Sequence, residues 1–401
     1  MLEFVRNIFH FEIAWKMRLK LFYYFAKFHA LAHFKYIENR NKVSFSFVSI
    51  IYGLVWVVGY FLLLLIALFS LSVFTEDSRN ESDIFLFVNT LEIVTIFFKG
   101  FSIYLLQVIQ STDLVLLINE AIAINQSVDH MHREITYTYG HRFVRLYNNK
   151  KCCVLLQFVL LFMCYYIYLK QSGHDAIKKV FGFLIVYTHF LTVVVSGLYI
   201  YGSLLLAYEF YHSLNRNLTQ VLKKVEVNQI SRTQMASYCQ ACDELDEISL
   251  TYTRISAYVG RIKRLFAVQI TFELLISFLL ITCALFYTFY ALLSRESLAT
   301  DNDFERLYGT FNSIMYSTIN FTVYFIEIYT ITCISNTVIG EAENLSTSIH
   351  KSVFSNADPR FIRSLQQLSL KTILEKPEIS PMGLFLIDRS LVIGVCLEKH
   401  W

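Results

Sequence analysis

The sequence predicts an all-α, polytopic membrane helix bundle that forms one domain over residues 1–401. Hydrophobic residues make up 55% of the chain and charged residues only 17%, whereas a typical soluble protein is about 25% charged. The apolar residues come in long uninterrupted blocks, which is the pattern of a chain whose solvent is lipid. Lys and Arg gather in alternate loops between these blocks, as expected for a multi-pass protein.

Six of the hydrophobic blocks are long enough to span a membrane. The first, residues 43–74, has no charged residue after Lys42 and would form a helix of about 48 Å, against about 30 Å for the hydrocarbon core. The seventh apolar stretch, 382–396, contains Asp388 and Arg389, which are candidate pore or gate residues. At about 22 Å it is too short to cross unaided. The other predicted spans lie near residues 84–109, 153–169, 180–210, 265–293 and 308–339.

The distribution of basic residues predicts a cytoplasmic N-terminus. Residues 1–42 and the loops after the second, fourth and sixth spans hold 26 Lys and Arg, and the opposite side holds seven. This orientation is the reverse of a G-protein-coupled receptor. The triplet at Asn80 is a glycosylation sequon on the predicted outer side. Apolar residues recur at helical spacing in 114–128, 235–264 and 361–374, which predicts that the long inner loops are helical extensions of the spans.

Charged residues at membrane depth are the first candidates for function, because each costs about 2.5–3.5 kcal/mol to insert. Glu92 and Lys99 lie seven residues apart on one predicted helix face. They would form an ion pair within or between helices, or Glu92 would line a ligand cavity. Glu273 and Glu327 fall in the inner halves of their spans. They would be buried helix partners, or part of an ion route or gate.

Aromatic side chains are dense at the outer ends of the third to sixth spans. An aromatic belt at the membrane interface explains this pattern, and so does an aromatic-walled pocket with a few polar groups for a small amphipathic ligand. The sequence carries no catalytic motif, nucleotide loop or basic tract, so we expect no enzyme activity, no cofactor, no metal and no nucleic-acid partner. The candidate ligand-binding residues, besides Glu92, are Tyr166, Tyr187, His189, Phe286, Tyr290, Phe311, Asn312 and Tyr316.

The C-terminal third resembles the insect gustatory receptors. The resemblance rests on Gly340-Glu-Ala-Glu-Asn, on Asp358-Pro-Arg-Phe-Ile-Arg and on Glu375-Lys-Pro-Glu-Ile-Ser-Pro-Met-Gly-Leu-Phe-Leu-Ile-Asp388. It implies a ligand-gated cation channel of contact chemosensation in the plasma membrane of gustatory neurons. It also implies a small-molecule tastant as ligand, surrounding lipids, and a homo- or hetero-tetramer of receptor subunits whose seventh helices surround a central pore.

One part of the sequence departs from that family. The family's seventh helix closes with Thr-Tyr and then Gln-Phe, whereas here Val395 is followed by Cys-Leu-Glu-Lys-His-Trp401. Two hypotheses therefore stand at this point. The chain is a conducting receptor subunit, or it is a non-conducting accessory subunit of a receptor complex.

Overall fold

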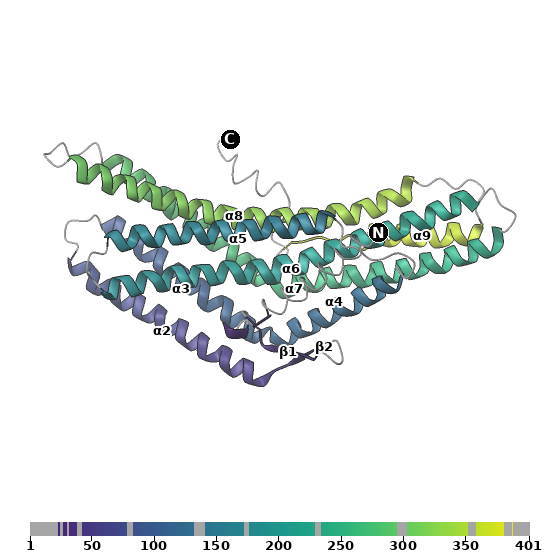
Figure 1. Cartoon of the computed structure of the whole chain (residues 1–401), viewed down its shortest axis with the longest axis horizontal. Coiled ribbons are helices and arrows are strands. Elements are labelled where there is room, and N and C mark those ends of the chain that lie inside the picture. Colours follow the sequence, from purple (N-terminus) through teal and green to yellow (C-terminus); the bar gives the residue numbers. More distant parts are fainter. Residues whose placement is uncertain are drawn as a thin grey trace, which may run out of the picture.

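The structure is a computed structural model in which nearly all described residues are helical (Figure 1). Within some helices the side chains are also left undescribed. The helices are α2 (Phe47–Asp77), α3 (Asp83–Ile109), α4 (Ser111–Met131), α5 (His141–Gln171), α6 (Ala176–Asn228), α7 (Gln234–Ser294), α8 (Asp303–Lys351) and α9 (Pro359–Leu374). The described residues are 23–24, 27–29, 32–37, 42–77, 83–131, 141–171, 176–228, 234–294, 303–351, 358–380 and 387.

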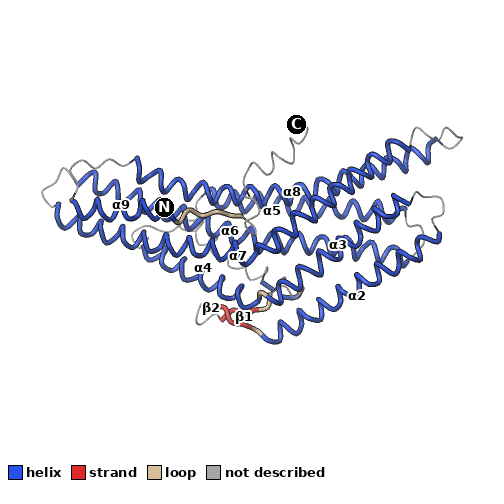
Figure 2. The backbone as a smooth tube through the Cα atoms, turned by 180° about the vertical axis from the view of Figure 1, so that it is seen from behind, coloured by secondary structure: helices blue, strands red, loops and turns tan. Residues whose placement is uncertain are grey.

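The long helices form an elongated bundle, and its two ends differ (Figure 1). At the left end, α2, α5 and α7 finish and α3, α6 and α8 begin. At the right end lie α9, the last part of α6 and the first part of α7 (Figures 1 and 2). The helix ends that border the predicted outer loops therefore lie together at one end of the bundle, as an alternating topology requires. Which end faces the cytosol stays a prediction.

The predicted helical extensions of the spans are confirmed. Helix α7 has 61 residues, α6 has 53 and α8 has 49. At 1.5 Å per residue even α8 is about 74 Å long, more than twice the hydrocarbon thickness. The three prolines of the chain lie beyond α8, and the first, Pro359, is the first residue of α9. There a missing N–H costs nothing, and the Asp358 side chain caps the helix by accepting from the Arg360 N–H at 2.8 Å.

Five helical segments in the described part of the chain are long and apolar enough to cross a membrane. The predicted fourth span, 180–210, lies within α6, which is helical throughout that range. The predicted seventh span, 382–396, lies outside the described residues except for Ile387. The five segments are Phe47–Ile66, Thr90–Ile109, Arg142–Ile167, Tyr238–Tyr290 and Thr318–Lys351.

A two-stranded antiparallel hairpin precedes the first long helix, and sequence reasoning did not predict it. Strands β1 (Phe34–Ile37) and β2 (Lys42–Phe45) pair with Phe34 opposite Phe45. Asn119 of α4 fixes β2 by accepting from the Val43 N–H at 2.8 Å and donating to the Val43 carbonyl at 2.9 Å. Because these residues are extended, helix α2 begins at Phe47 and not at residue 43.

Two glycines allow close approaches between α2, α3, α6 and the N-terminal segment. A Cβ at Gly53 of α2 would overlap the buried ring of His33. A Cβ at Gly100 of α3 would lie 2.9 Å from Thr188 Cγ2 of α6 and 3.0 Å from the ring of Tyr60. The absence of a side chain at these positions therefore lets α2, α3, α6 and the N-terminal segment pack tightly.

Candidate functional site

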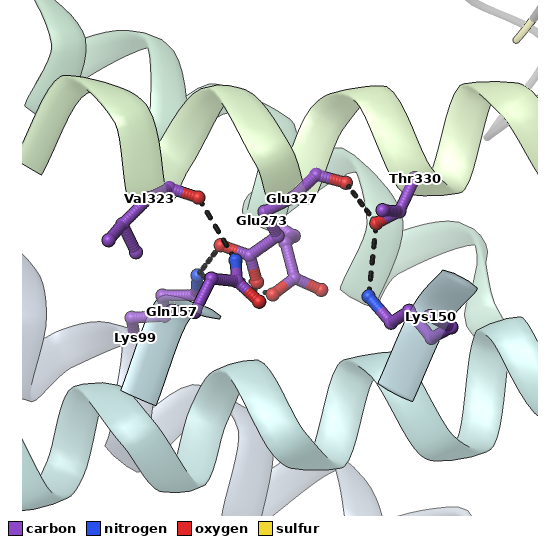
Figure 3. A network of polar contacts seen from close by, with 7 residues as sticks. All are labelled: Lys99, Lys150, Gln157, Glu273, Val323, Glu327 and Thr330. Atoms are coloured by element: carbon purple, nitrogen blue, oxygen red, sulfur yellow. Dashed lines mark hydrogen bonds and ion pairs between the residues drawn. The ribbon is translucent and has the colours of Figure 1, made fainter. Parts of the chain in front are cut away.

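A cluster of charged side chains lies inside the bundle, on three of the helical segments that could cross a membrane (Figure 3). Lys99 of α3 places its Nζ atom 3.1 Å from Glu327 Oε2 of α8 and 3.2 Å from Glu273 Oε1 of α7. The three side chains are only 1–2% exposed, and Figure 3 shows the two carboxylates facing each other. One ammonium group thus joins two carboxylates from different helices.

Helix α5 adds polar contacts to α8 close to Glu327. Lys150 Nζ donates to Thr330 Oγ1 at 3.0 Å, and that hydroxyl donates to the Glu327 carbonyl at 3.1 Å. About two turns before Thr330 on α8, the Val323 carbonyl accepts from Gln157 Nε2 at 3.0 Å (Figure 3). The cluster therefore connects α3, α5, α7 and α8, with two lysines and two glutamates in close proximity.

The buried-partner interpretation of Glu273 and Glu327 agrees with this geometry. Both carboxylates lie in the interior of the chain rather than on its surface. Burying charges costs several kcal/mol per ion, which the mutual attraction of a well-formed cluster offsets. Removing one member would leave uncompensated charge, so the cluster restricts which arrangements of the four helices are stable. A role of these residues in a pore or gate stays a prediction.

Glu92 occupies a second polar contact between α3 and α8. The Asn320 Nδ2 atom donates to Glu92 Oε1 at 3.3 Å, and both side chains are buried. Glu92 and Asn320 are separated by 228 residues, as are Lys99 and Glu327. The two helices thus carry two matched contacts, seven residues apart on each. Lys99 pairs between helices, with α7 and α8, and not with Glu92 along α3.

The described aromatic candidates fall into different surroundings. Phe286 and Tyr290 of α7 stack with ring centroids 6.1 Å apart. Tyr187 of α6 stacks on Phe183 at 5.9 Å. Tyr166 of α5 is 55% exposed on the surface of the single chain, where a belt position explains it as well as a pocket does. These contacts favour neither of the two interpretations for the whole set.

Several candidates lie outside the described residues. Asn80, Asp388 and Arg389 belong to segments that the structure does not describe, and four further side chains within described helices are likewise left out. Their assignments as ligand-binding, glycosylation, pore or gate residues stay predictions. The four are His189, Phe311, Asn312 and Tyr316.

Sequence reasoning missed an aromatic cluster in which the N-terminal segment takes part. His29 Nδ1 lies 2.9 Å from the Tyr187 hydroxyl oxygen. On the neighbouring helices, Tyr60 stacks on Tyr104 at 4.9 Å and Trp56 stacks on Tyr104 at 5.7 Å. Its signal in the sequence was weak, because aromatic residues are frequent throughout the chain and His29 lies before the first span.

Long apolar helices and a charged cluster buried within their bundle define the class, a multi-pass helical membrane protein. Comparison with known proteins gives the family. The sequence matches the 7tm chemosensory receptor family over residues 19–396. The chain therefore belongs to this family of chemosensory receptors.

A relative from Drosophila agrees with this assignment. The chain is 22% identical to a Drosophila melanogaster protein that carries the name gustatory receptor 94a, over 205 residues. That alignment covers 49% of this chain and 48% of the relative, so the chain matches about half of the relative's length.

Solved structures with a similar fold cover almost the whole chain. The insect olfactory receptor OR5 from Machilis hrabei superposes with a TM-score of 0.61 at 13% identity, over 96% of this chain and 97% of that one. Its complex with eugenol gives a TM-score of 0.60 at 13% identity, over 95% and 97%. At this identity the likeness shows the shared fold.

Proposed function

We propose that this chain is a subunit of a ligand-gated cation channel of contact chemosensation. Membership of the chemosensory receptor family over residues 19–396 carries the proposal. The relative named as a gustatory receptor supports taste as the modality. The fold shared with an olfactory receptor whose structure was solved with eugenol supports a small amphipathic ligand. The subunit would act as a homo- or hetero-tetramer in the plasma membrane of gustatory neurons.

The ligand would bind near the predicted outer ends of the spans. The described candidates there are Glu92, Tyr166, Tyr187, Phe286 and Tyr290. Binding would act by population shift: a ligand that binds the open arrangement more tightly moves the equilibrium toward it. Because Glu92 already contacts Asn320 of α8, a ligand at this position would change the contact between α3 and α8. That contact lies seven residues, or about 10 Å along each helix, from the buried charge cluster.

Electrophysiology tests the proposal directly. The chain is expressed alone and with a second receptor subunit, and cation currents are recorded with a panel of small amphipathic compounds, eugenol among them. We expect concentration-dependent currents from the chain, and a several-fold change of the half-maximal concentration in Glu92→Gln. Glu226→Gln, at an exposed position of α6, is the control. Current that requires the second subunit would favour the accessory hypothesis. If the properly inserted chain gives no current either alone or with the second subunit, the channel proposal is wrong.

A further inference from the structure

Two of the stretches that carry the family resemblance meet in the structure. Glu343 lies in the Gly340-Glu-Ala-Glu-Asn stretch near the end of α8, and Lys376 follows the end of α9. Lys376 Nζ and Glu343 Oε1 form an ion pair at 2.8 Å. The segment after α9 is therefore tied to α8 at its first residues.

Helix α7 also contacts the chain at the point where α9 ends. The Ser256 hydroxyl donates to the Glu375 carbonyl at 2.9 Å, and the Tyr252 hydroxyl donates to the same carbonyl at 3.3 Å. A helix leaves its last carbonyls without partners of its own. Here two hydroxyls of α7, one turn apart, supply donors to the carbonyl at the point where α9 ends.

We call the contacts of Glu375 with Tyr252 and Ser256, and of Lys376 with Glu343, the clamp. Beyond the clamp the chain is not helical, but it still packs against the bundle. Residues 376–380 are not helical. Ile379 is buried, and its carbonyl accepts from the Ile387 N–H at 2.9 Å. The predicted seventh span, 382–396, follows directly. The clamp thus holds Glu375 and Lys376, which precede that predicted span, against α7 and α8.

The part of α8 that carries Glu343 is also bound to α6. Glu341, two residues before Glu343, lies 2.9 Å from His212 Nδ1 of α6 and accepts from Asn344 Nδ2 at 3.2 Å. Ser348 of α8 also donates to Asn215 of α6 at 3.0 Å. One turn of α8 therefore binds α6 through Glu341 and the segment after α9 through Glu343.

We propose that Tyr252, Ser256 and Glu343 are positioning residues for gating. They couple α7 and α8 to Glu375 and Lys376, which precede the predicted seventh span, so that a displacement of either helix is passed on to these two residues. This inference rests on the proposed channel function, because it assigns the contacts of Glu375 and Lys376 with α7 and α8 a part in opening. None of the three residues needs to contact a ligand.

The experiment compares currents of four variants with wild type. A single hydrogen bond contributes about 0.5–1.5 kcal/mol, so Ser256→Ala should shift the half-maximal concentration or the basal current about 2- to 10-fold. E343K and K376E should each cause a shift of up to about 5-fold, and the double variant E343K/K376E should return toward wild type. The controls are Thr253→Val, whose hydroxyl bonds its own helix, and E247K at an exposed position of α7. Surface expression is measured for every variant.

Hydrogen–deuterium exchange of the purified chain gives a second readout that does not need current. Faster exchange in peptides spanning 376–387 is expected in Ser256→Ala and not in Thr253→Val. Unchanged gating in a chain that conducts overturns the inference, whatever the exchange shows. Unchanged exchange overturns it as well. A wild-type chain that never conducts overturns the proposed function instead, and faster exchange would then still support the positioning of the segment.

Discussion

The exposed pair of Lys376 with Glu343 and the buried cluster around Lys99 differ in strength although their distances are similar. The pair between Lys376 and Glu343 is shorter, at 2.8 Å, than the contacts of Lys99 with Glu327 and Glu273, at 3.1 and 3.2 Å. The shorter pair is about half exposed, whereas the Lys99 cluster is 1–2% exposed. Water and salt screen the first pair strongly and the second hardly at all.

The consequence is a difference in what each region can do. Breaking the buried cluster leaves an uncompensated buried charge, which affects whether the bundle folds. Breaking the exposed pair leaves two solvated charges, so the folded state survives. The interior cluster therefore determines the arrangement of the helices, and the exposed pair is suited to adjust a balance between folded states.

Lys99→Met should give the largest loss of stability. It leaves the Glu273 and Glu327 carboxylates facing each other inside the bundle, at a cost of about 3–5 kcal/mol. Thermal unfolding in detergent and the yield of monodisperse protein measure the effect. Lys223→Met, at an exposed position of α6, is the control. The triple variant Lys99→Met/Glu273→Gln/Glu327→Gln should recover much of the loss. If Lys99→Met unfolds at the same temperature as the control, the cluster is not a structural requirement.

His33 should make stability depend on pH. Burial lowers the pKa of His33 from 6.5 to about 4, so between these values the unfolded chain binds a proton that the folded chain does not. The free energy of unfolding therefore falls as the pH drops from 6.5 to 4, by roughly 3 kcal/mol from this residue. His33→Leu should lose that part of the pH dependence. Chemical unfolding at pH 7 and pH 5 tests this, and parallel profiles for the two proteins would contradict it.

Much of the fold follows from hydropathy and charge alone. Uninterrupted apolar blocks mark the helices between Phe47 and Lys351, and helical periodicity in the inner loops predicts their continuation. The β1–β2 hairpin was missed because its strands have four residues each, too short for an alternation pattern to stand out. Its stability also depends on Asn119, which is 76 residues from Val43.

The candidate site was only partly predictable, for a related reason. The cost of burying charge shows that Glu92, Lys99, Glu273 and Glu327 require partners, but not which partners they find. Lys99 and Glu327 are 228 residues apart, and their contact depends on the packing of three helices. One signal was present in the sequence: Asn320 and Glu327 repeat the seven-residue spacing of Glu92 and Lys99. That spacing indicates paired contacts only once α3 and α8 are known to face each other.

Gly53 offers a smaller test within the membrane region. A Cβ at this position overlaps the His33 ring, so Gly53→Ala should destabilise the chain by about 1–3 kcal/mol through overpacking. Gly59 lies on the same helix, and a Cβ there would meet no atom within 4 Å, so Gly59→Ala should be neutral or stabilise by up to about 1 kcal/mol. Unfolding midpoints of the two variants are compared. Equal midpoints would show that the N-terminal segment does not pack against Gly53.

The exposed pair should have the smallest effect on stability. Contact with Glu343 raises the pKa of Lys376, yet a pair this exposed contributes only about 0–1 kcal/mol. Lys376→Met should therefore unfold within about 1 kcal/mol of wild type, and high salt should reduce the difference further. Gating responds to the same interaction differently, because only the difference between two folded arrangements counts. A difference of about 1 kcal/mol changes their ratio roughly 5-fold, which dose–response recordings resolve. A Lys376→Met chain that unfolds far more easily than wild type would show instead that this contact, like the Lys99 cluster, is part of what holds the fold together.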